Sequence, residues 1–190
     1  MKRSKHSLSH YTLKSCNMGA LVPLTWYPVL PGDSIQQSTS VLTRVTPTKY
    51  PIMHPLRARV VHFYVPFRLL WEDWEEFRTG YTKDSAASTK TFPTIQFVNP
   101  AANTLADQLG IPPGTYTIDV NALPFRAYTL IYNEFFRDQQ LQSSLALDTS
   151  DGVDATTNTS IQNVNEERDY FTTARTSEQL GTEVSLPLRS

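Results

Sequence analysis

The feature that most constrains the fold of this chain lies at residues 65–77, where an apolar run meets a short amphipathic segment. Pro66 ends the strand-like run, because proline has no N–H to donate to a sheet. Leu70, Trp74 and Phe77 follow at i, i+4 and i+7, which places them on one stripe of a helix. Acidic residues fill the remaining surface. The pattern predicts a helix over about 66–79 that buries a single face.

Two aromatic residues lie at the margins of such stripes. Trp71 lies beside the first stripe, and Tyr132 belongs to a second one at 125–136. Aromatic stripes are typical of a hydrophobic core, but aromatic residues at their margins also anchor protein partners. The sequence therefore predicts Trp71 and Tyr132 as subunit-interface residues, with burial in the chain's own core as the alternative.

Strand signals are concentrated early in the chain. Residues 20–30 are apolar but interrupted by Pro23 and Pro28, as in an edge or irregular strand. Residues 34–45 alternate between apolar and polar, which predicts a half-buried strand. Residues 56–65, rich in β-branched and aromatic side chains, are the best candidate for a buried strand.

Helices are expected in the connections that follow. Asn99 and Pro100 supply an N-cap and a first-turn proline for a helix over about 100–110. Pro124 opens the longest predicted helix, to about 141, and residues 147–165 predict an exposed loop. The sequence thus indicates a mainly β domain over residues 19–190 with helical insertions, and not the alternating pattern of a doubly wound α/β fold.

Charge is divided unevenly along the chain. Residues 1–70 carry nine Lys or Arg against Asp33 alone, a net charge of +8, whereas residues 71–190 carry eight against 17 acidic residues, or −9. Residues 1–18 read as a basic arm, and cations on such an arm bind phosphates without sequence preference. The predicted nucleic-acid-binding residues are Lys2, Arg3, Lys5 and Lys14. The alternatives are a solubilising tail, or two halves that neutralise each other across a core or a subunit contact.

The chain lacks the common signatures of enzymes. No phosphate-binding glycine loop, nucleophile elbow or His-Glu metal helix is present, so we expect no catalytic residues, no cofactor and no metal. His6, His10 and Cys16 lack a fourth zinc ligand. Asp148, Asp151 and Asp154 fit a solvated acidic loop better than a calcium loop, with calcium held across subunits as the alternative. No apolar run is long enough for a membrane span.

Four segments together resemble a known family. They are Leu-Pro-Gly-Asp at 30–33, the segment 65–77, the segment 123–141 with its Leu-Pro-Phe-Arg-Ala-Tyr start, and Arg-Asp-Tyr-Phe-Thr at 168–172, followed by Val-Ser-Leu-Pro-Leu at 184–188. In this order and spacing they resemble the major capsid proteins of microviruses, small icosahedral single-stranded DNA phages, and most closely their gokushovirus-like branch. The resemblance runs along most of the 190 residues.

The resemblance implies a fold and a role. The fold is a viral jelly roll, an antiparallel β-sandwich with long loop and helical insertions. The role is self-assembly of about sixty copies into a closed T=1 shell around circular single-stranded DNA. The implied partners are further copies of the chain, the packaged DNA, a small basic DNA-packaging protein and other virion proteins. The implied location is the virion, assembled in the cytoplasm of a bacterial host without a membrane.

Family members are several hundred residues long, so this chain resembles their N-terminal portion and predicts an incomplete jelly roll. A rival interpretation comes from the charge pattern alone. The basic N-terminal half could serve as a free single-stranded nucleic-acid-binding module. A capsid protein should form a large closed particle, whereas a binding module should stay small and lose its ligand at high salt.

Overall fold

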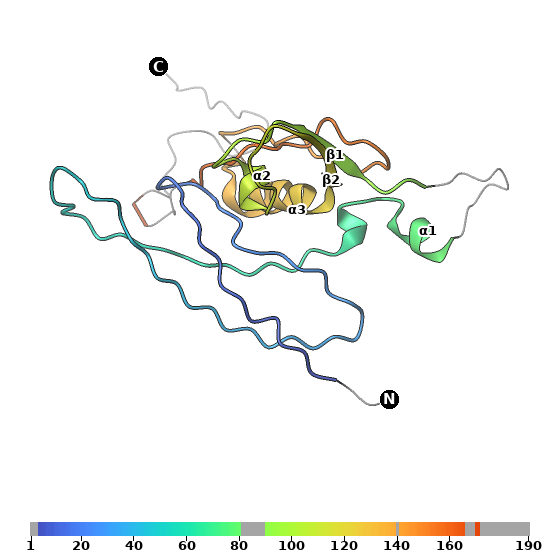
Figure 1. The fold of residues 1–190 in the computed structure, drawn as a ribbon, viewed down its shortest axis with the longest axis horizontal. Coiled ribbons are helices and arrows are strands. Elements are labelled where there is room, and N and C mark those ends of the chain that lie inside the picture. The colour runs from blue at the N-terminus through green and yellow to red at the C-terminus, as the bar shows by residue number, and fades with distance from the viewer. Residues whose placement is uncertain (1–3, 81–89, 140, 166–169, 172–190) are drawn as a thin grey trace, which may run out of the picture. The chain divides into compact units, whose positions relative to one another are not determined.

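The computed structural model describes residues 4–80, 90–139, 141–165 and 170–171. The chain divides into two compact units, Met1–Trp26 with Val65–Ser190, and Tyr27–Tyr64. Every helix and strand found among the described residues belongs to the first unit (Figure 1).

The first unit contains a two-stranded antiparallel sheet. Strand β1 (Thr94–Val98) pairs with β2 (Thr117–Asn121), and Ile95 lies opposite Val120. Ile95 is buried and Phe97 is partly buried against the same core, so alternate residues of β1 turn one face inward. The sequence analysis predicts neither strand, because five residues give too short an alternation to stand out.

Helix α2 (Leu105–Gln108) is shorter than predicted and begins later. Its N-cap is Thr104, whose hydroxyl accepts a hydrogen bond from the Asp107 N–H at 3.5 Å. The Asp107 carboxylate in turn accepts the N–H of Asn103, the residue before the N-cap, at 2.8 Å, so the two side chains form a reciprocal cap related to the capping box. The predicted start at Asn99 is wrong, since Asn99 adopts a left-handed conformation with φ of 50°. The N-cap residue of a helix typically adopts the extended region instead, as Thr104 does.

Helix α3 (Leu123–Ile131) continues directly into η2 (Tyr132–Phe136), a single π-helical turn. The helical conformation ends at Arg137, whose backbone is extended, and not near residue 141 as predicted. The Arg137 N–H donates to the Tyr132 carbonyl, the wide i→i−5 bond of a π-turn.

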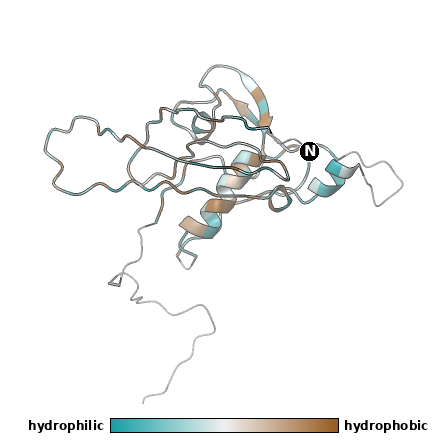
Figure 2. Ribbon diagram, turned by 90° about the horizontal axis from the view of Figure 1, so that it is seen from below, coloured by the Kyte–Doolittle hydropathy of each residue, from teal (hydrophilic) through white to brown (hydrophobic). Residues whose placement is uncertain are grey.

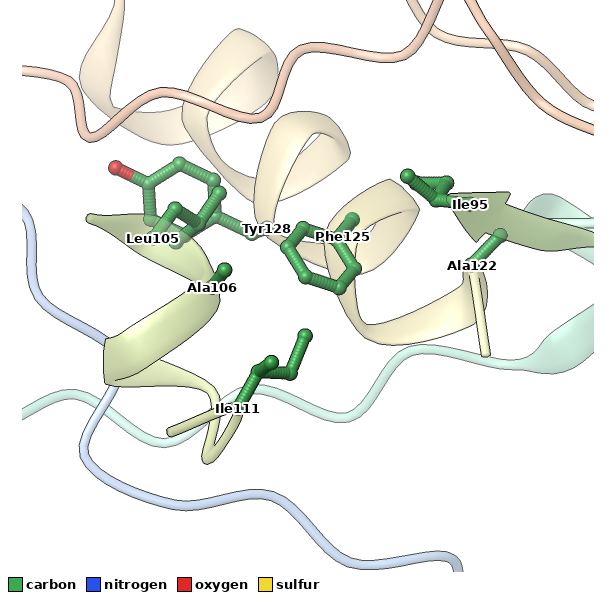
Figure 3. Close-up of a cluster of buried hydrophobic side chains, with 7 residues drawn as sticks. All are labelled: Ile95, Leu105, Ala106, Ile111, Ala122, Phe125 and Tyr128. Atoms are coloured by element: carbon green, nitrogen blue, oxygen red, sulfur yellow. The ribbon is translucent and has the colours of Figure 1, made fainter. Parts of the chain in front are cut away.

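Two clusters of buried side chains form the core. The first joins the sheet, α2 and α3 (Figure 3) and contains Ile95, Leu105, Ala106, Ile111, Ala122, Phe125 and Tyr128. The second contains Leu70, Trp71 and Leu123. It is flanked by the 3₁₀ turn η1 (Phe67–Leu69) and by α1 (Trp74–Thr79).

The predicted helix over 66–79 is therefore two short helical pieces separated by a turn. Trp71, between the pieces, has no exposed surface, whereas Phe77 of the predicted stripe is 44% exposed. In Figure 2, α1 is largely teal and hydrophilic, while α3 carries brown, hydrophobic stretches. This contrast fits a peripheral α1 and a central α3.

The Tyr27–Tyr64 unit has no helix or strand among its residues (Figure 1). The strands predicted over 34–45 and 56–65 are not formed, and neither is one over 20–30, where Ala20 makes a single bridge to Asn163. The apolar and β-branched composition is present, but a strand also requires a hydrogen-bonded neighbour. Residues 34–45 and 56–64 of this unit contact each other through His62. Its ring nitrogens lie 2.7 Å from Gln37 Nε2 and 3.3 Å from Thr39 Oγ1.

The segment 147–165 is irregular, as expected, but it is not simply exposed. Gly152 and Asp154 exchange backbone hydrogen bonds with Thr94 of β1, at 3.0 and 2.8 Å. Asp154 and Thr157 are buried. The prediction of an exposed loop is wrong at these positions, because a polar loop can bury polar side chains that bond to each other.

Candidate functional site

The basic N-terminal segment forms hydrogen bonds with the rest of the first unit from Lys14 onward. The Lys14 ammonium donates to the Gln108 carbonyl at the end of α2, and Gln108 Nε2 donates to the Ser15 carbonyl at 3.1 Å. The Trp26 indole N–H donates to the Leu109 carbonyl at 3.4 Å. Burial lowers the pKa of Lys14, with the charge of Asp107 acting in the opposite direction. Cations bind well at the C-terminal end of a helix, where unpaired carbonyls gather.

The four predicted nucleic-acid-binding cations are consequently in different situations. Lys5 is exposed, Lys14 is partly buried against α2, and Lys2 and Arg3 lie outside the described residues. Because the Lys14 ammonium already donates to Gln108, it is not freely available to a phosphate, and binding of nucleic acid by this set stays a prediction. Lys14 has a role that the charge pattern did not indicate, which is to attach the segment to α2.

The two predicted interface residues lie in the core of the first unit. The Trp71 ring is fully buried, with ring centroids 4.8 Å from Phe77, 5.5 Å from Phe92 and 6.0 Å from Trp74. Tyr132 is 5% exposed, and its hydroxyl donates to Gln142 Oε1 at 3.2 Å. Both positions match the core alternative, and contact with a neighbouring subunit stays a prediction.

Arg126 forms a buried polar network in the first unit that the sequence analysis missed. Its side chain and that of Asp154 are both fully buried, and Arg126 Nε–H donates to Asp154 Oδ2 at 2.8 Å. Arg126 Nη1 donates to the Leu70 and Ser150 carbonyls at 3.0 and 2.9 Å. One guanidinium therefore joins α3, the turn before α1 and the loop 147–157.

Asp154 has further partners in its own loop. It accepts the N–H groups of Thr156 and Thr157 at 3.1 and 3.0 Å and the Thr157 hydroxyl at 2.7 Å. Burial opposes ionisation, but the hydrogen bonds from Thr157 and Arg126 outweigh it and lower the pKa of Asp154. A carboxylate this fully occupied by donors is suited to holding a fold together and not to transferring protons. Arg126 in the apolar helix sequence Leu-Pro-Phe-Arg-Ala-Tyr was the signal that could have predicted a buried pair.

The other loop carboxylates are also engaged locally. Asp148 accepts the N–H and hydroxyl of Ser150, and Asp151 accepts the Thr91 N–H. Within the described parts of the chain, no group of three or more His, Cys, Asp or Glu residues is arranged to hold a metal ion. None of the described helices has the length and apolar character to span a bilayer.

Comparison with known proteins identifies the chain's relatives. It is 34% identical over 190 residues to the capsid protein VP1 of Bdellovibrio phage phiMH2K, an alignment that covers 98% of this chain and 35% of that protein. It is 35% identical to the VP1 of Chlamydia phage 1 over 210 residues, covering 98% of this chain and 35% of the relative. It is 33% identical to the VP1 of Spiroplasma virus 4 over 199 residues, an alignment that covers 97% of this chain and 36% of that protein. The chain thus spans about a third of the length of these curated relatives.

The family comparison agrees with these relatives. The family model described as capsid protein (F protein) matches residues 1–190, so the match covers both compact units. The resemblance to microvirus major capsid proteins, and to their gokushovirus-like branch, is confirmed by these matches. The chain therefore belongs to the phage capsid protein (F protein) family.

Proposed function

We propose that this chain is part of a structural major capsid protein, which assembles with copies of itself into a closed T=1 icosahedral shell around a circular single-stranded DNA genome. The observation that carries the proposal is the capsid family match over residues 1–190. Closed symmetry repeats each modest contact between identical subunits many times, which makes such a shell stable. No residue is required to make or break a covalent bond, and the protein acts in the virion after assembly in the bacterial cytoplasm.

We further propose that the complete fold is a jelly roll and that strands outside these 190 residues complete it. Two features of the chain support this. The Tyr27–Tyr64 unit has strand-like composition without a paired strand, and many of its apolar side chains are exposed. They include Val41 at 51%, Leu42 at 84% and Met53 at 91%. Unpaired strand-like segments with exposed apolar surface are stabilised by adding neighbouring strands.

The internal organisation of the first unit also suits a shell subunit. Its buried ion pair and two core clusters fix α3, the sheet and the loop 147–157 to one another. A subunit that makes contacts in several directions needs such a rigid body, because each contact loses free energy if its residues must first be ordered. The buried Arg126–Asp154 pair supplies rigidity without occupying surface.

Particle size tests the proposal directly. The full chain, and the longer protein that contains it, would be examined by mass photometry and by analytical ultracentrifugation, with the intact mass of the denatured subunit measured in parallel. We expect the longer protein to form megadalton particles that contain nuclease-protected single-stranded DNA. A protein that stays monomeric and binds DNA in a salt-sensitive way would instead establish a free nucleic-acid-binding module.

A further inference from the structure

Strand β2 forms one edge of the two-stranded sheet, and that edge is open. Strand β1 pairs with β2 on one side and, at Thr94, forms a bridge to the loop residue Val153 on the other, so the β1 edge is partly covered. Among the described residues, no strand or bridge lies on the outer side of β2. Helix α3 covers one face of the sheet (Figure 1) and does not pair with its edge.

The hydrogen bonds at the two ends of the ladder show which backbone groups of β2 point outward. The Ala122 N–H donates to the Pro93 carbonyl at 3.1 Å, and the Asn99 N–H donates to the Tyr116 carbonyl at 2.8 Å. Bonded and non-bonded pairs alternate along an antiparallel ladder, so the even-numbered residues of β2 bond to β1. The backbone groups that point away from β1 are those of Thr117, Asp119 and Asn121.

These outward backbone groups have no hydrogen-bond partner within the described parts of the chain. The Asp119 carboxylate accepts a hydrogen bond from Gln96 Nε2 at 2.9 Å, and so uses only its side chain. Asn121 likewise accepts the Leu123 N–H through its side-chain oxygen, at 2.9 Å. Thr117 and Asp119 are both exposed. A row of unpaired N–H and C=O groups is a template for an added strand.

Strand β2 lacks the features that normally protect a sheet edge. Its sequence, Thr-Ile-Asp-Val-Asn, contains no proline and no lysine, and it pairs with β1 residue for residue without a bulge. Its one charged residue, Asp119, is bonded to Gln96 of β1. Proline, lysine and bulges are common means by which proteins prevent edge-to-edge pairing. An unprotected edge therefore predicts that another strand covers it in the assembled protein.

The edge is complementary to a second copy of itself. In an antiparallel pairing centred on Ile118, Thr117 of each copy lies opposite Asp119 of the other, and the two residues exchange both backbone bonds. Directly opposed side chains are neighbours on one face, so the Thr117 hydroxyl can donate to the facing carboxylate. A pairing centred on Asp119 would instead oppose two carboxylates, which is unfavourable.

The exposure of Ile118 supports the same register. Ile118 shares a face of the sheet with Val120, which packs against the core, but it lies outside the core cluster and is 40% exposed. In the pairing centred on Ile118, the two isoleucines meet across the symmetry axis and cover each other's exposed surface. A pairing centred on Val120 would set Ile118 opposite Ala122, which is fully buried at the N-cap of α3.

We propose that the outer edge of β2 pairs with β2 of a second copy about a two-fold axis at Ile118, which joins the sheets of both copies into one continuous sheet. The identity of the partner rests on the proposed function, because members of a capsid protein family assemble with copies of themselves. An edge this short makes few bonds, so the contact is weak in an isolated pair and gains strength from repetition in a closed shell. A strand from elsewhere in the longer protein is the competing occupant.

Disulfide cross-linking of the longer protein tests the register. Opposed residues of a non-bonded antiparallel pair have Cα atoms about 4.5 Å apart, within the range that a disulfide spans. In a background where Cys16 and any other cysteine is replaced by serine, Ile118→Cys should therefore give cross-linked dimers under mild oxidation. Thr117→Cys is the matched control, also exposed and one position away. Its Cα would lie about 7–8 Å from that of its copy, so it should cross-link about tenfold more slowly or less.

A pair of proline variants tests the edge itself. Because the Thr117 N–H points outward, Thr117→Pro removes a donor from the open edge and leaves the ladder to β1 intact. We expect it to reduce the cross-linking of Ile118→Cys by about tenfold or more, since each copy loses one bond to the other. Val98→Pro removes an outward N–H from the opposite edge, on β1, and should leave the cross-linking unchanged.

Mass photometry of the same samples separates this contact from the capsid proposal. Particles without Ile118→Cys dimers would overturn the edge pairing and assign the edge to a strand of the same subunit, while the capsid proposal stands. Ile118→Cys dimers in a protein that forms no particles would support the edge pairing while the capsid proposal fails. Equal cross-linking rates for Ile118→Cys and Thr117→Cys would overturn the pairing, because random collisions do not distinguish neighbouring positions.

Discussion

At the scale of single residues, Arg126 of α3 joins two other segments of the first unit to its helix. It bonds to Leu70, in the turn before α1, and to Ser150 and Asp154, in the loop 147–157. Arg126→Met would leave the Asp154 carboxylate buried without its cation, a change that costs about 3–5 kcal/mol in comparable pairs. We expect urea denaturation to show this loss in the free energy of unfolding.

A second arginine serves as the control for this change. Arg68→Met removes an exposed guanidinium and should alter the free energy of unfolding by less than about 0.5 kcal/mol. Equal stability of the two variants would contradict a structural role for the buried pair.

The Asp154 carboxylate of this pair makes the free energy of unfolding depend on pH. Its pKa is lowered in the folded state, so the unfolded chain binds the proton first as the pH falls. The stabilisation is complete above the unfolded pKa of about 3.9 and is lost as the pH falls toward the folded value. Asp154→Asn should be less stable than wild type at neutral pH but should lose less stability between about pH 5 and pH 2.

Urea midpoints measured across this pH range check the expectation. Asp119→Asn, at an exposed carboxylate of β2, is the matched control and should follow the wild-type pH dependence. A wild-type pH profile in Asp154→Asn would show that the carboxylate does not carry the acid sensitivity.

At the scale of elements, α2 depends on its reciprocal cap, because a helix of four residues has few internal hydrogen bonds of its own. Thr104→Ala removes the acceptor for the Asp107 N–H and should destabilise the first unit by about 1 kcal/mol. Thermal unfolding followed by circular dichroism measures the change. Thr43→Ala, at an exposed threonine in the other unit, should differ from wild type by less than about 0.5 kcal/mol. Identical melting of the two variants would contradict the capping role.

The elements also show how far the sequence predicts this structure. Helical turns occur within all three predicted ranges, since the apolar periodicity near Trp74 and Phe125 is a local signal. The boundaries differ because caps compete: Asn99 and Thr104 are both good N-cap residues, and the carboxylate of Asp107 favours Thr104. Strand pairing is not local, so composition alone could not reveal that residues 34–45 lack a neighbour.

The residues of the candidate site also divide into those that local sequence predicts and those that depend on distant parts of the chain. A basic, apolar unit and a basic arm are evident from the sequence, because charge is a property of composition. The attachment of Lys14 to Gln108 and the burial of Trp71 depend on residues more than 20 positions away in the chain, such as Phe92. Arg126 and Asp154 are 28 residues apart, and only the folded chain brings them together.

At the scale of the whole molecule, the alternation along residues 34–45 predicts different consequences of neighbouring substitutions. Val41 alternates in register with Ile35 and Val45, so Val41→Ser should reduce the fraction of the longer protein that forms particles, because we expect strands from outside this chain to cover that apolar side. Leu42→Ser, in register with Ser38 and Ser40, should leave this fraction unchanged. Both side chains are already exposed in this chain, so its free energy of unfolding should change by less than about 0.5 kcal/mol. Mass photometry measures the particle fraction, and equal losses in both variants would contradict this assignment of the apolar side.

The hydroxyl of Tyr128 links the beginning of the chain to its later part. It donates to the Leu21 carbonyl at 3.0 Å and accepts the Gln162 N–H at 2.9 Å, while the Leu21 N–H donates to the Gln162 carbonyl at 2.8 Å. About 140 residues separate Leu21 from Gln162, and a ribosome adds about 5–20 residues per second. The early segment thus waits roughly 7 to 28 seconds for its partner during synthesis. Throughout that interval its apolar residues are open to other nascent chains on the same messenger RNA, so translation speed in this region sets how long the growing subunit is vulnerable to aggregation.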